Sequence, residues 1–173
     1  MLSNESKRAT GKSSNNGTYI NFSKGKVFAT TPEGKETYQE ISGYICDIML
    51  TTRTIGSRNS KYWYIILKDE GERYKLGFYY EDSSFKGVIM ALREKGIKST
   101  DRVTFVPYLN GDFTNIDIYL NDSGESLRWT GKLPEIEIVK ARGKAYKDST
   151  KRMEFIKQSV ADIVAGLGYS KGK

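Results

Sequence analysis

Residues 61–80, KYWYIILKDEGERYKLGFYY, combine aromatic rings and cations in a pattern suited to binding nucleobases and phosphates. Seven of these twenty residues are aromatic, and Lys and Arg stand among them. Rings offer flat surfaces on which unpaired bases stack, and neighbouring cations attract the sugar–phosphate backbone. Because a protein core also needs aromatic residues, the face of the strand that each ring occupies decides between the two roles.

Alternation predicts a β-hairpin whose two faces differ in character. Residues 61–68 and 73–80 form its predicted strands, and residues 69–72 form the turn. One face is apolar and is predicted to enter the core with Trp63, Ile65, Leu67, Tyr74, Leu76, Phe78 and Tyr80. The other face is predicted to point outward, with Gly77 removing bulk among Tyr62, Tyr64, Tyr79, Lys68, Arg73 and Lys75.

Each outward tyrosine also has a purely structural interpretation. Tyrosine suits an exposed pleated surface, and cross-strand tyrosine pairs stabilise sheets. A reversed register would exchange the two faces and make Trp63 the outward ring. The combination of rings and cations, rather than any single residue, therefore supports a base-stacking surface.

A second group of cations lies immediately before and at the start of this hairpin. Residues 51–61, TTRTIGSRNSK, contain Arg and Lys but no acid. We expect a flexible basic loop here, which would either close over a bound strand or serve as a plain linker. Loop and hairpin together give the predicted nucleic-acid-binding set: Arg53, Arg58, Lys61, Tyr62, Tyr64, Lys68, Arg73, Lys75 and Tyr79.

The residue types that most catalytic and metal chemistry needs are scarce. The chain has no histidine and a single cysteine, Cys46, so the usual general base and the common zinc ligand sets are missing. Paired carboxylates such as Asp69 and Glu70 stand beside predicted turns, as solvated acids do. We therefore expect no enzyme activity, no cofactor and no metal.

The positive charge is concentrated near the C-terminal end of the 173-residue chain. The net charge is +7, and residues 128–173 carry eleven Lys and Arg against five acids, whereas residues 41–127 carry eleven against twelve. A local basic excess of this kind favours a polyanionic partner, although solubility alone would also explain it. The basic run at residues 139–153 could make a second electrostatic contact with nucleic acid.

The predicted elements that position these residues are mostly strands. A hairpin is expected at residues 18–31, a long bent strand at 40–56, and a second hairpin at 101–121 whose turn is the NGD sequence. One or two edge strands are expected within residues 127–139. Two amphipathic helices are predicted from apolar residues at helical spacing, one over residues 82–96 with Phe85, Val88, Ile89 and Leu92 and one over 148–168 with Met153, Ile156, Val160, Ile163, Val164 and Leu167.

This order, three strands, a helix and two strands, resembles the OB-fold, and the leading hairpin YINFSKGKVFATT resembles that of phage-type single-stranded DNA-binding proteins. The resemblance covers residues 18–125. It implies a mainly β fold, a five-stranded barrel with a helix between strands 3 and 4, to which the chain adds a C-terminal helix. It also implies sequence-nonspecific binding of single-stranded DNA in DNA replication and recombination, on the surface of strands 2 and 3 and under the loop at residues 51–61.

The resemblance leaves other readings open. Arg102, Tyr108, Arg128 and Trp129 could extend the binding groove. An RNA-binding OB module, or a structural subunit whose tyrosine face meets another protein, would use the same residue types. The chain ends GLGYSKGK, whereas many single-strand binders of this kind end in an acidic tail that recruits partners.

The expected organisation has three parts: a disordered polar arm at residues 1–17, an OB-fold domain with its leading hairpin at 18–140, and a basic linker with the amphipathic helix at 141–173. The expected partner is single-stranded DNA, with replication proteins and further copies of the chain as candidates and no membrane. One cysteine and no apolar leader favour a cytoplasmic setting, in a bacterial or phage-infected host cell.

Overall fold

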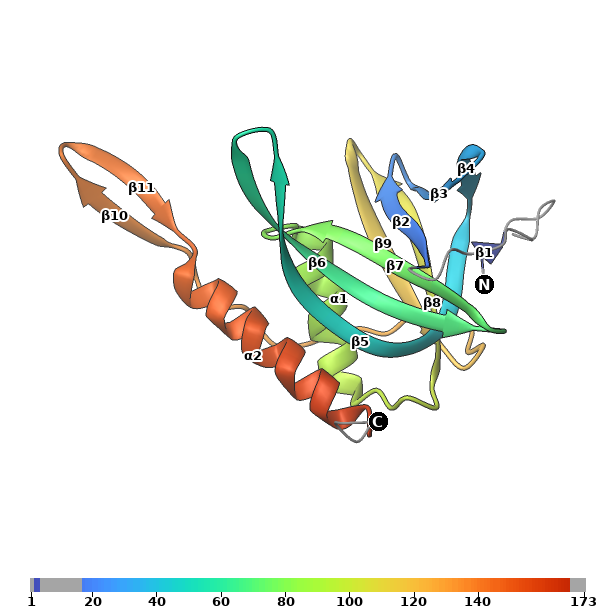
Figure 1. Cartoon of the computed structure of the whole chain (residues 1–173). Helices are drawn as coiled ribbons and strands as arrows, with labels where there is room; N and C mark the ends of the chain where they lie inside the picture. The colour runs from blue at the N-terminus through green and yellow to red at the C-terminus, as the bar shows by residue number, and fades with distance from the viewer. Residues whose placement is uncertain (1, 4–16, 169–173) are drawn as a thin grey trace.

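The computed structural model describes residues 2–3 and 17–168 and is mainly β. Of the predicted disordered arm at residues 1–17, residues 1 and 4–16 lie outside the described residues, while Leu2–Ser3 form a strand that pairs with Glu40–Ile41. The elements, coloured along the chain in Figure 1, are β1 (Leu2–Ser3), β2 (Thr18–Ser23), β3 (Lys26–Thr31), β4 (Gly34–Tyr38), β5 (Glu40–Ile55), β6 (Arg58–Asp69), β7 (Glu72–Tyr79), α1 (Ser83–Lys95), β8 (Arg102–Asn110), β9 (Phe113–Leu120), β10 (Glu137–Ala141), β11 (Lys144–Asp148) and α2 (Thr150–Gly166).

The large sheet is open, so the prediction of a closed five-stranded barrel with a helix between strands 3 and 4 is wrong. Its strands follow the order β4-β3-β2-β7-β6-β5-β8-β9, and α1 lies between β7 and β8 in the chain. β2 pairs in parallel with β7, from Thr18 opposite Tyr74 to Ile20 opposite Leu76. The leading hairpin thereby occupies the edge of β7 that a fifth barrel strand would need.

The leading hairpin also contacts the other end of the curled sheet. The backbone N–H of Gly25, in the β2–β3 turn, donates to Thr114 Oγ1 of β9 at 3.0 Å. A Cβ at Gly25 would lie 3.0 Å from the backbone nitrogen of Leu109 in β8. The hairpin therefore lies between β7 and the β8–β9 pair and separates them.

Three local features of the structure differ from the predictions. Residues 34–38, which lie between the predicted hairpin at 18–31 and the predicted strand at 40–56, form β4, which pairs with β3. The expected loop at residues 51–61 is a hairpin in which Ile55 of β5 pairs with Arg58 of β6 across a tight turn. The expected edge strands within residues 127–139 are largely absent, because β10 begins only at Glu137.

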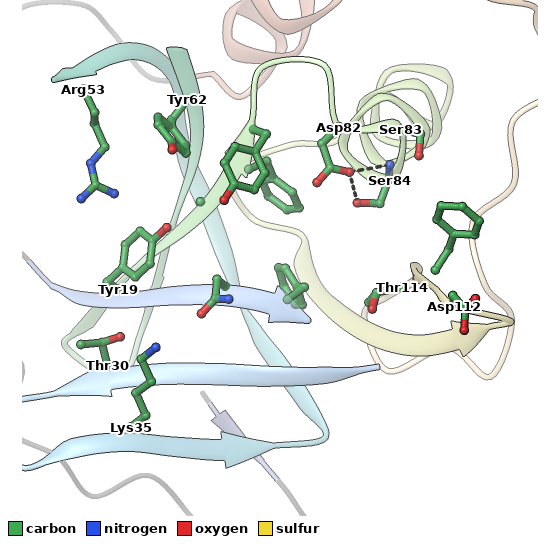
Figure 2. Close-up of a pocket in the computed structure, with 16 residues that line it drawn as sticks. Tyr19, Thr30, Lys35, Arg53, Tyr62, Asp82, Ser83, Ser84, Asp112 and Thr114 are labelled. Atoms are coloured by element: carbon green, nitrogen blue, oxygen red, sulfur yellow. Dashed lines mark hydrogen bonds between the residues drawn. The ribbon is translucent and has the colours of Figure 1, made fainter. Parts of the chain in front are cut away.

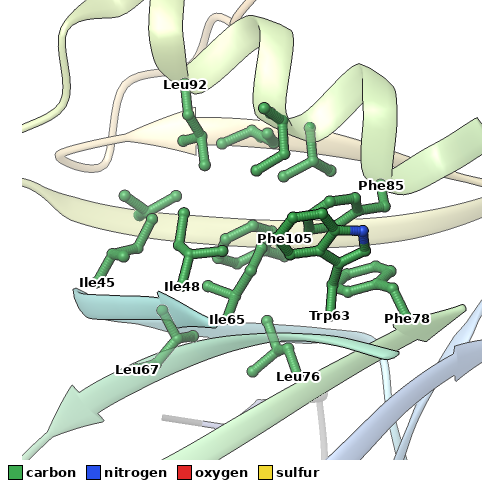
Figure 3. Close-up of a cluster of buried hydrophobic side chains, with 14 of the residues drawn as sticks. Ile45, Ile48, Trp63, Ile65, Leu67, Leu76, Phe78, Phe85, Leu92 and Phe105 are labelled. Carbon is green, nitrogen blue, oxygen red and sulfur yellow. The ribbon is translucent and has the colours of Figure 1, made fainter. Parts of the chain in front are cut away.

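The core lies between the inner face of the sheet and the two helices, as Figure 3 shows for its central part. Trp63 is 2% exposed and stacks on Phe85 of α1 with ring centroids 5.0 Å apart. Its indole N–H donates to the backbone oxygen of Tyr80 at 3.2 Å. The predicted register of the hairpin at residues 61–80 is therefore confirmed, since its apolar face enters the core.

Both predicted helices are present and pack by their apolar faces. Asp82 caps α1 by accepting a hydrogen bond from the backbone N–H of Ser84 at 2.8 Å, and Gly96 ends it in the left-handed conformation with φ of 68°. The buried face of α2 joins the same core with Met153, Ile156, Val160 and Ile163. No helix among the described residues has the length and apolar character that crossing a membrane requires.

Candidate nucleic-acid interface

A groove of about 510 Å³ opens where β2, β6, β7, α1 and the β8–β9 turn approach one another. We call it the aromatic groove, and Figure 2 shows Tyr19 and Tyr62 on one side of it and Asp112 and Thr114 on the other. Its side chains come from segments that are distant in sequence. The lining residues are Tyr19, Asn21, Phe22, Thr30, Lys35, Arg53, Tyr62, Gly77, Phe78, Tyr79, Asp82, Ser83, Ser84, Asp112, Phe113 and Thr114.

Tyr62 and Tyr79 form a pair of rings at this groove. They are opposite each other in the antiparallel β6–β7 register and so share a face of the sheet. Their ring centroids are 5.2 Å apart with the planes tilted by 41°. Tyr79 is 67% exposed, so its ring is open to an incoming base. Phe113, at the start of β9, is 76% exposed and supplies another accessible ring.

Tyr19 reaches the groove because β7 has a glycine beneath it. A Cβ built on Gly77 would lie 2.6 Å from the Tyr19 hydroxyl oxygen and 2.9 Å from a ring carbon. The Tyr19 ring also meets the edge of Tyr64, with centroids 6.2 Å apart and planes at 74°. Burial, followed by the nearby Tyr64 hydroxyl, raises the pKa of Tyr19.

The outward tyrosines differ in accessibility, and the expectation that all three are exposed is wrong for two of them. Tyr62 is 9% exposed and Tyr64 is 7% exposed. With Ile66 they form a small apolar cluster that is separate from the main core and is packed against by Tyr19 and Cys46. Their predicted face is correct, but much of it is covered, because β2 adds to the edge of β7 and brings Tyr19 across the hairpin.

Two of the predicted cations lie over these rings. The guanidinium carbon of Arg53 is 5.4 Å from the centroid of Tyr62, and Lys75 Nζ is 5.2 Å from that of Tyr64. Such contacts hold the cations beside the aromatic surface. Arg53 itself lines the aromatic groove, so of the predicted set the structure places Arg53, Tyr62 and Tyr79 together there.

The remaining predicted cations lie away from the groove lining. Arg58 is exposed beside the tip of the β5–β6 hairpin. Lys61 is exposed and places Nζ 5.0 Å from the centroid of Tyr80, the residue immediately after β7. Lys68 and Arg73 are exposed opposite each other at the far end of the β6–β7 hairpin. These four residues therefore lie outside the lining of the groove.

The lining has balanced charge. Lys35 and Arg53 face two carboxylates, Asp82 and Asp112. One oxygen of Asp82 is occupied as the cap of α1, where it accepts from the N–H groups of Ser84 and Phe85. Asp112, in the β8–β9 turn, is exposed. The aromatic rings, rather than a charge excess, are thus the distinctive feature of the groove.

A second cavity of about 300 Å³ adjoins the aromatic groove and shares Ser83 and Ser84 with it. Tyr108, Arg128 and Trp129 line this cavity, as expected for residues that extend the groove. Arg102 lies elsewhere, because its guanidinium pairs with Asp69 and Asp122 at 3.5 and 3.4 Å.

Sequence reasoning missed Tyr19, Lys35 and Phe113 as groove residues. Phe113 follows the NGD turn directly, and a large apolar residue at a turn is a usable signal. Tyr19 and Lys35 carry no such signal, since their place depends on the pairing of β2 with β7 and of β4 with β3.

The described residues contain no cluster of three or more His, Cys, Asp or Glu side chains arranged to hold a metal ion. Comparison of the chain with protein-family models, with curated protein sequences and with solved structures finds no match.

Proposed function

We propose that this protein binds single-stranded DNA without sequence preference, by stacking bases in the aromatic groove and attracting phosphates to the cations around it. The resemblance of the leading hairpin, residues 18–31, to that of phage-type single-stranded DNA-binding proteins suggests that it does so during DNA replication or recombination. No catalytic step, metal or cofactor enters the proposal.

The observation that carries the proposal is the group of accessible rings at one groove. Tyr79 and Phe113 are 67% and 76% exposed, and Tyr62 and Tyr19 lie beside them. A base needs an open ring face for stacking, and only unpaired bases can offer both of their own faces. Stacking is tolerant of sequence because every base has such a face.

The cations supply the second part of the mechanism. Arg53 is held against Tyr62, so its guanidinium stands next to a stacking surface where a phosphate of a bound strand would pass. Arg58, near the tip of the same β5–β6 hairpin, is exposed and free to meet the next part of the backbone. Backbone contacts of this kind add affinity but no sequence information.

The test is a titration of a labelled 20-nucleotide oligo-dT by fluorescence anisotropy, with wild type and with Tyr79→Ala. Tyr79→Ala should weaken binding about 5- to 150-fold, since removing a stacking ring costs about 1–3 kcal/mol per base. Its exposure predicts little change in thermal unfolding.

Tyr44→Ala is the matched control, because Tyr44 is 37% exposed on β5 and lies outside the groove lining. It should bind the oligomer as wild type does. Equal affinity of Tyr79→Ala and wild type would refute the stacking site. Competition with an RNA oligomer of the same length measures the preference for deoxyribose over ribose. Tighter binding of RNA would overturn the assignment to DNA.

A further inference from the structure

We propose that the β10–β11 hairpin, here called the β-arm, binds duplex DNA beside the single strand held in the aromatic groove. The protein would then engage a junction between single-stranded and double-stranded DNA. The single-strand half of this inference rests on the proposed function, whereas the duplex contact rests on the β-arm alone.

The β-arm projects from the rest of the fold. Among the described residues, its two five-residue strands pair with each other and with no third strand. Residues 137–147 are all exposed, and Figure 1 shows the hairpin extending beyond the N-terminal end of α2. An isolated two-stranded hairpin is at best marginally stable in water, so a partner that orders it is expected.

The turn of the β-arm places a cation at its tip. Arg142 and Gly143 have φ angles of 52° and 73°, the conformation of a tight hairpin turn in which Asn and Gly are favoured. An arginine at the first position goes against this local preference. Its presence puts a guanidinium at the outermost point of the hairpin.

All four charged residues in the outer part of the β-arm are cations. Residues 138–147 contain Lys140, Arg142, Lys144 and Lys147 and no acid. The two acids at its base are engaged: Glu137 pairs with Lys151 at 2.5 Å, and Asp148 accepts from the backbone N–H of Thr150 at 2.9 Å. Charge complementarity therefore favours a polyanion over an apolar or basic partner.

The cations lie on both faces of the β-arm. This distribution suits a DNA groove, which has a sugar–phosphate backbone on each side. The register puts Lys140 and Lys147 on one face and Lys144 on the other, with Arg142 between them in the turn. The major groove of B-DNA, about 12 Å wide, admits a two-stranded ribbon. Binding of single-stranded DNA by stacking would instead require aromatic side chains along one face of the hairpin. Tyr146 is the one aromatic residue among residues 137–148.

In Figure 1 the β5–β6 hairpin is drawn between the β-arm and the strands β2 and β9, which contribute to the lining of the aromatic groove. In Figure 1 both hairpins project from the same side of the molecule. Arg58 near the tip of the β5–β6 hairpin is exposed, and Arg53 on the same hairpin lines the groove. Cations thus continue from the groove toward the β-arm, as binding to both parts of a junction requires.

The experiment compares wild type with Arg142→Gln/Lys144→Gln on three labelled probes at 50 mM salt. The probes are a 20-nucleotide oligo-dT, a 20-base-pair duplex, and that duplex with an oligo-dT tail. The double variant should bind the duplex at least about tenfold more weakly, with a salt slope shallower by about 1.8 for two lost phosphate contacts. It should bind the oligo-dT within about twofold of wild type.

Lys95→Gln/Lys98→Gln is the control, because both lysines are exposed at the C-terminal end of α1 and just beyond it. Any of three results would overturn the β-arm proposal. The Arg142/Lys144 variant could bind the duplex as tightly as wild type, or lose as much affinity for oligo-dT as for the duplex. The control variant could lose as much affinity for the duplex as the Arg142/Lys144 variant does. Thermal unfolding should be the same in all three proteins, which confirms that the binding changes do not come from misfolding.

The results also separate this proposal from the proposed function. Tyr79→Ala should lose affinity for oligo-dT and keep its affinity for the duplex. Wild type that binds duplex but not oligo-dT would refute the single-strand function and leave the duplex contact standing. Wild type that binds oligo-dT but not duplex would refute the β-arm proposal alone and point to an acidic protein as the partner of this hairpin.

Discussion

At the scale of single residues, Gly77 determines how the aromatic groove is built. It faces Tyr64 across the β6–β7 ladder, and its missing side chain leaves the space that the Tyr19 ring occupies. Glycine weakens a strand interior, so a glycine here indicates close approach of another group. The Tyr19 ring is that group, and it connects the leading hairpin to the stacking surface.

Gly77→Ala should therefore weaken oligo-dT binding about as much as Tyr19→Ala does, by about fivefold or more if a stacking contact is lost. The new Cβ would lie 2.6 Å from the Tyr19 hydroxyl oxygen, so the ring must turn away. Anisotropy titration of both variants and of the Gly77→Ala/Tyr19→Ala double variant measures their coupling.

Gly124→Ala is the control, because nothing lies within 4 Å of a Cβ built there. If both substitutions act through the ring, the double variant should bind like either single one. Additive losses would show that Gly77 acts on binding by some route other than Tyr19.

At the scale of elements, the apolar face of α2 is part of the core. Ile156 is fully buried and Met153 is 3% exposed, both in the main cluster with α1 and β5. Arg93 of α1 also lies 5.1 Å from the Phe155 ring centroid and pairs with Asp162 at 3.5 Å. The expected boundary between residues 140 and 141 falls within β10 of the β-arm.

Ile156→Ala should lower the free energy of unfolding of the whole protein by about 2–5 kcal/mol, the usual cost of emptying a buried aliphatic site. Urea unfolding followed by circular dichroism measures it. Glu154→Ala, an exposed neighbour on the same helix, should change stability by less than about 0.5 kcal/mol. A transition in which α2 unfolds separately, with the sheet unaffected, would contradict the assignment of α2 to the core.

At the scale of the whole molecule, the net charge of +7 is placed mainly outside the aromatic groove. Two cations and two carboxylates line the groove, whereas the β-arm holds four cations beyond its base. Single-strand affinity should accordingly depend more on stacking than on charge. Duplex affinity should depend more on charge.

Salt titration tests this division. With Lys35, Arg53 and Arg58 as the phosphate contacts, log affinity for oligo-dT should fall against log salt with a slope of about −2, or about −0.7 per contact. Arg53→Gln should make the slope shallower by about 0.7, while Lys98→Gln should leave it unchanged. A slope near zero for wild type would exclude the proposed phosphate contacts.

Local patterns predicted much of the fold and part of the site. Alternation in residues 61–80 assigned Trp63 to the core and Tyr62 and Tyr79 to the opposite face, because a strand's period of two is independent of its neighbours. Helical spacing of Phe85, Val88, Ile89 and Leu92 placed α1 in the same way, because the helical period also depends only on local sequence. The tight turn at residues 56–57 was missed because Gly and polar residues suit both loops and hairpin turns.

What the sequence by itself determined is therefore which face each residue of an element occupies. What only the tertiary structure decided is which elements meet. The parallel pairing of β2 with β7 joins residues more than fifty positions apart and leaves no periodic signal in either strand. That pairing kept the sheet open, covered Tyr64 with Tyr19, and brought Phe113 of β9 to the same groove as Tyr62 of β6.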